Sequence, residues 1–180
     1  DSYLLFEYDQ VKVGIEICED LWVPIPPSSE LTMQGANLIV NLSASNELIG
    51  KHAYLRSLIA QQSARCIAGY VYASAGFGES STDLVFGGNG IIAENGVILE
   101  ESERFSMKEQ LVISEIDIEN LMNDRRVNTS FMQGYTNHNL TSATCVPFSL
   151  SKHSLQLTRT IDPHPFTPSG NALKERVVGH

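Results

Sequence analysis

The stretch Val11-Lys-Val-Gly-Ile-Glu-Ile-Cys18 places an apolar side chain at every second position from Val11 to Ile17. A period of two is typical of a β-strand, because successive side chains of a strand point to opposite faces of the sheet. We therefore expect a strand here, with its apolar face buried in the core. Cys18 is expected to end this strand on the opposite face.

Further strands and helices are predicted on both sides of this strand. Asp9-Gln10 predicts a tight turn after a strand over residues 3–8. Ser28 and Asp117 are residue types that favour helix N-caps, and each begins a predicted helix. Because helices separate several of the more numerous strands, the sequence predicts a mixed α/β domain of layered α+β type. The other expected strands cover 37–42, 67–73, 89–93, 97–100 and 111–116, and the expected helices cover 28–34, 51–65 and 117–126.

The composition argues against several classes of partner. The chain has 12 Lys+Arg against 21 Asp+Glu and a formal net charge of −9. We expect no nucleic-acid partner and no anionic membrane partner, because both require clustered positive charge. No apolar run approaches the roughly 18 residues of a membrane span. The three cysteines show neither a CxxC nor a zinc-ligand spacing, so we expect no metal site and a cytoplasmic location.

The hydrophobic periodicity fades after about residue 127. Residues 131–164 are rich in Thr, Ser and Asn and contain prolines, which predicts a wrapping segment and linker. The chain starts without Met and stops without a turn or tail. We therefore expect it to be part of a longer protein.

Cys18 is the first candidate for chemistry. A reactive thiol needs exposure at the end of a strand or helix and a partner that favours the thiolate. Glu16 lies two residues earlier and would repel a thiolate, so it is a poor sole activator. Two alternatives remain open from the residues alone: a small buried hydrophobe, or a Cys–His pair with one of the five histidines, none of which has a recognisable local signature.

The stretch Gly14-Ile-Glu-Ile-Cys-Glu-Asp-Leu-Trp22 resembles the nucleophile segment of the carbon–nitrogen hydrolase (nitrilase) superfamily, and within it the glutaminase domains of glutamine-dependent NAD synthetases. The resemblance covers residues 1–130 and implies the C-terminal half of a glutaminase domain, with half of a four-layer α-β-β-α sandwich. Residues 165–180 resemble the start of a synthetase domain. Further matching stretches are Asn41-Leu-Ser-Ala-Ser-Asn46, Gly50-Lys51, Ser63-Ala-Arg-Cys-Ile-Ala-Gly-Tyr-Val-Tyr72, Gly76-x-Gly78-Glu-Ser80, Gly90-Ile-Ile-Ala-Glu-Asn-Gly96 and Pro165-Phe-Thr-Pro168.

The resemblance implies hydrolysis of the glutamine side-chain amide by a Glu–Lys–Cys triad, with Cys18 as the nucleophile. The backbone N–H of Glu19 would stabilise the oxyanion. Glu19, Trp22, Ser45 and Lys51 would contact the substrate. The Glu and Lys of the family lie upstream of the nucleophile strand and find no counterpart in the 17 residues before Cys18. We therefore expect this chain to be inactive alone.

Lys51 also has a physical argument of its own. It opens a predicted helix, where the helix dipole disfavours a cation. Together with the helix N–H groups, its ammonium would suit the carboxylate of an amino acid. The alternatives are a solvated surface lysine and, for Trp22, an ordinary core tryptophan.

The resemblance also implies partners and cofactors. Ammonia would pass to a synthetase domain that converts deamido-NAD to NAD. Sites for ATP, Mg and deamido-NAD are expected there and no cofactor is expected in this chain, which lacks a Ser-Gly-Gly-x-Asp-Ser loop. A homo-oligomer through the nitrilase-type interface is expected. The alternatives are a non-catalytic module that supplies an oligomer interface and an ammonia conduit, or another amidase or nitrilase of the superfamily.

Overall fold

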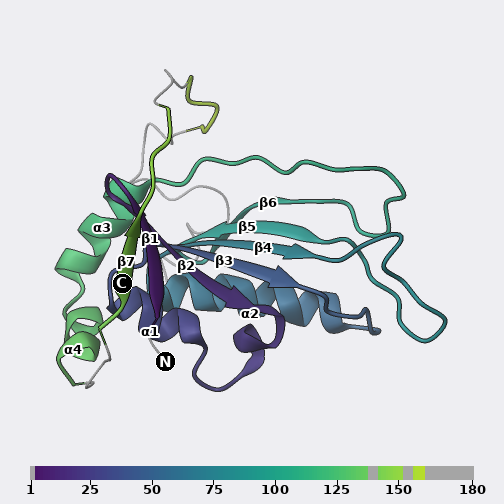
Figure 1. The fold of residues 1–180 in the computed structure, drawn as a ribbon, viewed down its shortest axis with the longest axis horizontal. Helices are drawn as coiled ribbons and strands as arrows, with labels where there is room; N and C mark the ends of the chain where they lie inside the picture. Colours follow the sequence, from purple (N-terminus) through teal and green to yellow (C-terminus); the bar gives the residue numbers. More distant parts are fainter. Residues whose placement is uncertain (1–2, 138–141, 152–155, 161–180) are drawn as a thin grey trace, which may run out of the picture.

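The computed structural model describes residues 3–137, 142–151 and 156–160. Within these ranges the chain builds a seven-stranded mixed sheet in the order β6-β5-β4-β3-β2-β1-β7, and α1 and α2 pack against one face of it (Figure 1). The strands are β1 (Leu4–Tyr8), β2 (Val11–Ile17), β3 (Leu38–Ser43), β4 (Gly69–Ser74), β5 (Gly90–Glu94), β6 (Val97–Glu101) and β7 (Thr144–Pro147), and the helices are the 3-10 helix η1 (Cys18–Trp22), α1 (Pro27–Met33), α2 (Lys51–Cys66), α3 (Ile118–Val127) and α4 (Thr129–Asn137).

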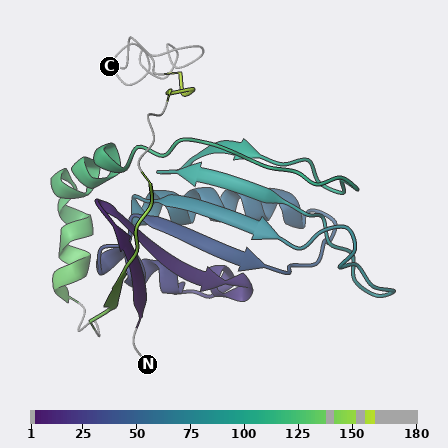
Figure 2. The same cartoon turned by 45° about the horizontal axis from the view of Figure 1, so that its top comes forward.

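The centre of the sheet is parallel and its sides are antiparallel. β2, β3 and β4 run in the same direction, with Ile17 opposite Leu42 and Ser43 opposite Ser74. β1 and β5 pair antiparallel with the outer members of this trio. The β5–β6 hairpin turns at Asn95-Gly96, where both residues have positive φ, as a two-residue hairpin turn requires. The three parallel strands therefore end together at one edge of the sheet, which Figure 2 shows from a second angle. The mixed α/β class predicted from the sequence is confirmed.

The buried face of β2 is the opposite of the predicted one. Gly14 and Glu16 face the helices and are buried, whereas Ile15 and Ile17 are 42% and 61% exposed. The reason is the close approach of α1, because a Cβ at Gly14 would lie only 3.1 Å from Cδ1 of Leu31. Glycine lets the helix approach this side of the strand. The prediction that the alternating apolar residues face the core is therefore wrong.

The outer face of the sheet carries these apolar side chains. Leu42, the partner of Ile17 in the ladder, is also exposed there. The coil after β6 crosses part of this face, since Ile116 lies against Gly69 of β4. One face covered by helices and one largely bare apolar face is the arrangement expected for half of a four-layer α-β-β-α sandwich.

Three local predictions are corrected by the structure. The helix expected from Ser28 has Pro26 as its N-cap residue and Pro27 at its first position, because the fixed φ of proline suits a helix start. Residues 111–116 form a coil rather than a strand, since Val112 and Ile116 lie over β5 and β4 while Leu111 and Ile113 are exposed, and the stretch pairs with no edge of the described sheet. The stretch predicted as a wrapping linker contains α4 and β7, and β7 pairs in parallel with β1. Residues 165–180, predicted to begin a synthetase domain, lie outside the described residues.

Arg125 of α3 binds the backbone at the end of the sheet where β3 and β4 begin. Its guanidinium donates hydrogen bonds to the carbonyl oxygens of Ala36, Cys66 and Ile67 at 2.7, 2.9 and 3.0 Å. The ring of Phe131 lies 4.9 Å from its central carbon. Burial lowers the pKa of Arg125 to about 10, so the side chain remains charged at neutral pH. This arginine thus serves the carbonyl of Ala36 after α1 and those of Cys66 and Ile67 at the end of α2.

Replacement of Arg125 by lysine should lower the free energy of unfolding by about 2–4 kcal/mol, because an ammonium cannot reproduce the planar fork that serves three carbonyls. Urea unfolding followed by circular dichroism measures the change. The neighbouring Arg126 is exposed, so Arg126→Lys is the matched control and should shift the stability by less than about 0.5 kcal/mol. Equal midpoints for the two variants would contradict this role.

Candidate active site

One open cavity, of about 390 Å³, brings together all the residues that the sequence predicted to act on a substrate. It lies where β2 and β3 end, beside η1 and the start of α2 (Figure 1). In sheets with parallel strands, ligands bind in the crevice beyond the carboxyl ends of the strands. The cavity is lined by Cys18, Glu19, Trp22, Ala44, Ser45, Asn46 and Lys51.

Cys18 stands at the junction between β2 and η1. Its φ of 50° is in the left-handed region, which a residue other than glycine rarely adopts. The turn breaks the alternation of β2, so the face of Cys18 does not follow from the period of two. The Cys18 N–H donates to Oδ1 of Asn41 at 3.2 Å, and the side chain is half-buried at the cavity. Strained backbone of this kind clusters at functional sites.

The hydroxyl groups of Ser43 and Tyr72 form a short chain of hydrogen bonds that ends at the sulfur of Cys18. The Ser43 hydroxyl donates to Sγ of Cys18 at 3.5 Å, and the Tyr72 hydroxyl donates to Oγ of Ser43 at 2.9 Å. Burial raises the pKa of Tyr72, so this phenol remains a donor at neutral pH. The sequence reasoning missed both residues. Ser43 lies on β3 and Tyr72 on β4, and both strands run parallel to β2 and end at the same edge as Cys18. This parallel arrangement is the signal that points to them.

Lys51 is held over the cavity by neutral partners. Its ammonium donates to the backbone oxygen of Asn46 at 2.7 Å and to Oδ1 of the same residue at 3.2 Å. It also lies 5.3 Å from the ring centroid of Trp22, which in turn stacks at 5.5 Å on Tyr54. These contacts fix the position of the ammonium without neutralising its charge. Asn46 is a third residue whose role at the site the sequence reasoning missed.

The charges at the cavity are opposite in sign. Among the described residues that line it, Glu19 contributes a carboxylate and Lys51 an ammonium. Ser45, on the loop that follows β3, adds a hydroxyl to the lining. Such a surface can bind a small molecule that carries both a positive and a negative group.

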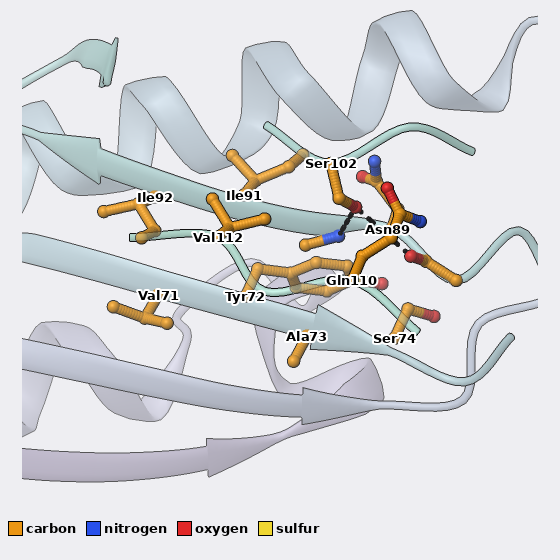
Figure 3. Close-up of a pocket in the computed structure, with 12 residues that line it drawn as sticks. Val71, Tyr72, Ala73, Ser74, Asn89, Ile91, Ile92, Ser102, Gln110 and Val112 are labelled. Atoms are coloured by element: carbon orange, nitrogen blue, oxygen red, sulfur yellow. Dashed lines mark hydrogen bonds between the residues drawn. The ribbon is translucent and has the colours of Figure 1, made fainter. Parts of the chain in front are cut away.

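A second cavity, of about 260 Å³, lies on the outer face of β4 and β5 (Figure 3). The Ser102 hydroxyl accepts a hydrogen bond from Gly90 N–H at 2.7 Å and donates one to the Gly88 oxygen at 3.2 Å. Val112 and Gln110 close it from the coil that crosses the sheet. Its described lining contains no thiol and no charged side chain, so the cavity at Cys18 is the better candidate for catalysis.

Metal sites and membrane spans were sought in the same described residues. No group of three or more His, Cys, Asp or Glu side chains in this part of the chain is placed to hold a metal ion. No helix within residues 3–137, 142–151 and 156–160 has the length and apolar character needed to cross a membrane.

The fold thus places the thiol of Cys18 where parallel strands end, in a sheet that helices cover on one face. Residues 1–126 match the carbon–nitrogen hydrolase family, and since this is most of the chain, the chain belongs to that family. The family predicted from the nucleophile segment is confirmed. The carbon–nitrogen hydrolase of Helicobacter pylori G27 supports the fold, with a TM-score of 0.61 at 17% identity over 73% of this chain and 48% of that one.

Within the family, the chain is similar to glutamine-dependent NAD(+) synthetases. It is 40% identical over 162 residues to that of Mycobacterium leprae, a match that covers 86% of this chain and 23% of the synthetase. The solved structure of the Acinetobacter baumannii glutamine-dependent NAD+ synthetase in complex with adenosine diphosphate gives a TM-score of 0.59 at 28% identity, and covers 67% of this chain and 22% of that one. The chain thus spans less than a quarter of these relatives.

Iodoacetamide should modify Cys18 and Cys145 in the folded protein well before Cys66. Cys145 is exposed and Cys18 borders the cavity, whereas Cys66 is 3% exposed and burial raises its pKa. Peptide mass spectrometry after timed labelling gives the three rates, and unfolding in urea is the control in which all three should react. If Cys18 proves as protected as Cys66, the sulfur cannot be reached from the cavity.

Proposed function

We propose that this chain is the part of a glutaminase domain that carries the nucleophile, and that the cavity at Cys18 binds glutamine and releases ammonia from its side-chain amide. The observation that carries the proposal is the convergence on one cavity of five residues from two separate segments of the sequence: Cys18, Glu19 and Trp22 from the first, and Ser45 and Lys51 from the second.

The charges of the cavity suit the two ends of an amino acid. The ammonium of Lys51, at the first turn of α2, is placed to bind the α-carboxylate together with the helix N–H groups. The carboxylate of Glu19 can accept hydrogen bonds from the α-ammonium group. Trp22 offers an apolar wall for the two methylene groups, and the Ser45 hydroxyl a further polar contact. In this pose the amide carbon reaches Cys18.

The reaction divides amide hydrolysis into two steps. The Cys18 thiolate forms a bond with the amide carbon, and the electron pair of the C=O bond moves to the oxygen, where the N–H of Glu19 stabilises the negative charge. Collapse of this intermediate breaks the C–N bond, and the nitrogen takes up a proton and leaves as ammonia. Water then cleaves the thioester to glutamate and restores the thiol. In this proposal the general base and the lysine of the family's triad come from sequence outside this chain.

The fate of the ammonia follows from the relatives. Because the chain covers 23% of a glutamine-dependent NAD(+) synthetase, we propose that it works within a longer polypeptide. A synthetase domain there would use the ammonia, with ATP, Mg and deamido-NAD, to form NAD in the cytoplasm. A homo-oligomer remains part of the proposal. The competing functions are a non-catalytic interface and ammonia conduit, and an amidase or nitrilase for another substrate.

Cys18→Ala in the full-length enzyme should abolish NAD synthesis from glutamine and leave synthesis from added ammonia unchanged. The reason is that the alanine removes only the sulfur that accepts the acyl group. Cys145→Ala is the matched control and should retain both activities, because Cys145 lies on β7 away from the cavity lining. Unchanged use of glutamine by Cys18→Ala would favour a non-catalytic module. If the parental enzyme hydrolyses another amide but not glutamine, and Cys18→Ala loses that hydrolysis, the chain would belong to another amidase.

Lys51→Met should raise KM for glutamine about 10- to 100-fold and change kcat little, because a charge-assisted hydrogen bond to the carboxylate contributes about 1.5–3 kcal/mol of binding. Steady-state glutaminase kinetics of the full-length enzyme provide the measurement. Lys12→Met is the control, since Lys12 pairs with Glu7 on the β1–β2 hairpin and should keep the parental KM. A fall in kcat at constant KM would contradict the assignment of Lys51 to carboxylate binding.

A further inference from the structure

The chain contains a deeply buried carboxylate that the proposed reaction does not use. Glu16 is 1% exposed and lies on the helix side of β2, outside the lining of the cavity. Its two oxygens accept hydrogen bonds from the Tyr70 hydroxyl and from the Ser28 N–H at 2.9 Å. Neither partner is a cation. A buried carboxylate held by neutral donors is costly to the folded state, so its presence calls for a physical reason.

The hydrogen bonds that start at Glu16 continue to the nucleophile. Asn41 donates from Nδ2 to the Tyr70 hydroxyl oxygen at 3.2 Å, and its Oδ1 accepts from Cys18 N–H at 3.2 Å. Asn41 and Tyr70 are 1% and 0% exposed, so water does not compete for these groups. Glu16 is therefore connected to the main chain of Cys18 by an unbroken buried series of hydrogen bonds.

Every hydrogen bond in this series is donated toward Glu16. The Tyr70 hydroxyl donates to Oε1 of Glu16. Burial, and then the charge of Glu16, raise the pKa of Tyr70, which keeps the proton on the phenol. The remaining lone pair of Tyr70 accepts the amide N–H of Asn41. This orients the Asn41 amide so that its oxygen, and not its nitrogen, faces the N–H of Cys18.

Asn41, the last side chain of the series, binds Cys18 just beyond the point where the pairing of β2 with β3 ends. The ladder between β2 and β3 ends with Ile17 opposite Leu42, and the next residue, Cys18, turns to a φ of 50°. Its N–H has therefore left the strand ladder, and the Asn41 side chain takes the place of a backbone acceptor. Without this bond the left-handed conformation loses the contact that opposes its intrinsic strain.

We infer that Glu16, Tyr70 and Asn41 form a positioning relay that holds the main chain of Cys18 in the conformation that directs its sulfur, and the N–H of Glu19 after it, into the cavity. The inference rests on the proposed function of Cys18. None of the three residues lines the cavity, so they act through Cys18 and not on the substrate.

The relay is tested in the full-length enzyme with Tyr70→Phe, which removes one oxygen atom and leaves the Asn41 amide free to turn. We expect kcat for glutamine hydrolysis to fall 10- to 100-fold while KM stays within about twofold, because a displaced nucleophile reduces the rate without loss of substrate contacts. Synthesis from added ammonia should be unchanged. Glu16→Gln should act in the same direction, since an amide offers a single acceptor oxygen to Tyr70 and Ser28, and it keeps the test open if Tyr70→Phe does not fold.

Asn37 supplies a matched control for Asn41. It is also 1% exposed, and its Oδ1 accepts from the N–H of Lys12 at 2.9 Å, at the opposite end of β2 from Cys18. Asn37→Leu and Asn41→Leu should lower the melting temperature to a similar extent. Only Asn41→Leu should lower kcat.

The outcomes separate the relay from the proposed function. Parental kcat in Tyr70→Phe or Glu16→Gln, or an equal loss of kcat in Asn37→Leu and Asn41→Leu, would overturn the relay and leave the role of Cys18 intact. If Cys18→Ala still hydrolyses glutamine, the proposed function itself fails. A rise in KM alone would also count against the relay, because it would show that the three residues shape the substrate site.

Discussion

Parallel pairing of β2 with β3 is the constraint on which the rest of the structure depends. Because Ile17 lies opposite Leu42, the two strands end at the same level, and the turns that follow them share one edge of the sheet. The turn after β2 contains Cys18, and the loop after β3 contains Ser45. The next helix, α2, begins at this edge with Lys51. A parallel ladder thus brings Cys18 together with Ser45 and Lys51, which lie 27 and 33 residues further along the sequence.

The helix-covered face of the sheet is unusually polar near this edge. Glu16 and Asn41 occupy positions where apolar side chains would pack at lower desolvation cost. Their hydrogen bonds join β2, β3 and β4 through Tyr70, so they restrict how the strand ends can be arranged. The other face carries apolar side chains that are exposed where the coil after β6 does not cover them. The apolar core and the hydrogen bonds that shape the edge therefore share the helix-covered face, where Tyr70 belongs to both.

The comparison of sequence and structure is most instructive at β2. The period of two located the strand correctly, yet the buried face was the one with Gly14 and Glu16. Alternation shows that the two faces of a strand differ, but it does not show which face a helix covers, and here the smallness of Gly14 lets α1 pack on its side. The strand predicted at 111–116 failed for a related reason, because alternation does not show whether a free edge is available for pairing.

The candidate site was more predictable than its surroundings. The resemblance around Cys18 and Lys51 named residues that the structure places on one cavity, although their roles remain predictions. The residues that support Cys18 through hydrogen bonds but do not line the cavity, namely Ser43, Tyr72 and Asn41, were missed. Serine, tyrosine and asparagine are common in strands and loops, and nothing in their local sequence distinguishes a hydrogen bond to a neighbouring strand from one to water.

The sequence by itself located most of the strands and helices, the family and five of the residues that line the cavity, because these follow from local periodicity and from a continuous motif. The tertiary structure decided which face of β2 is buried, the left-handed turn at Cys18 and the hydrogen bonds that reach it from β3 and β4. These features depend on contacts between segments distant in the chain. Their energies arise only when the strands are paired and water is excluded, so no local pattern records them.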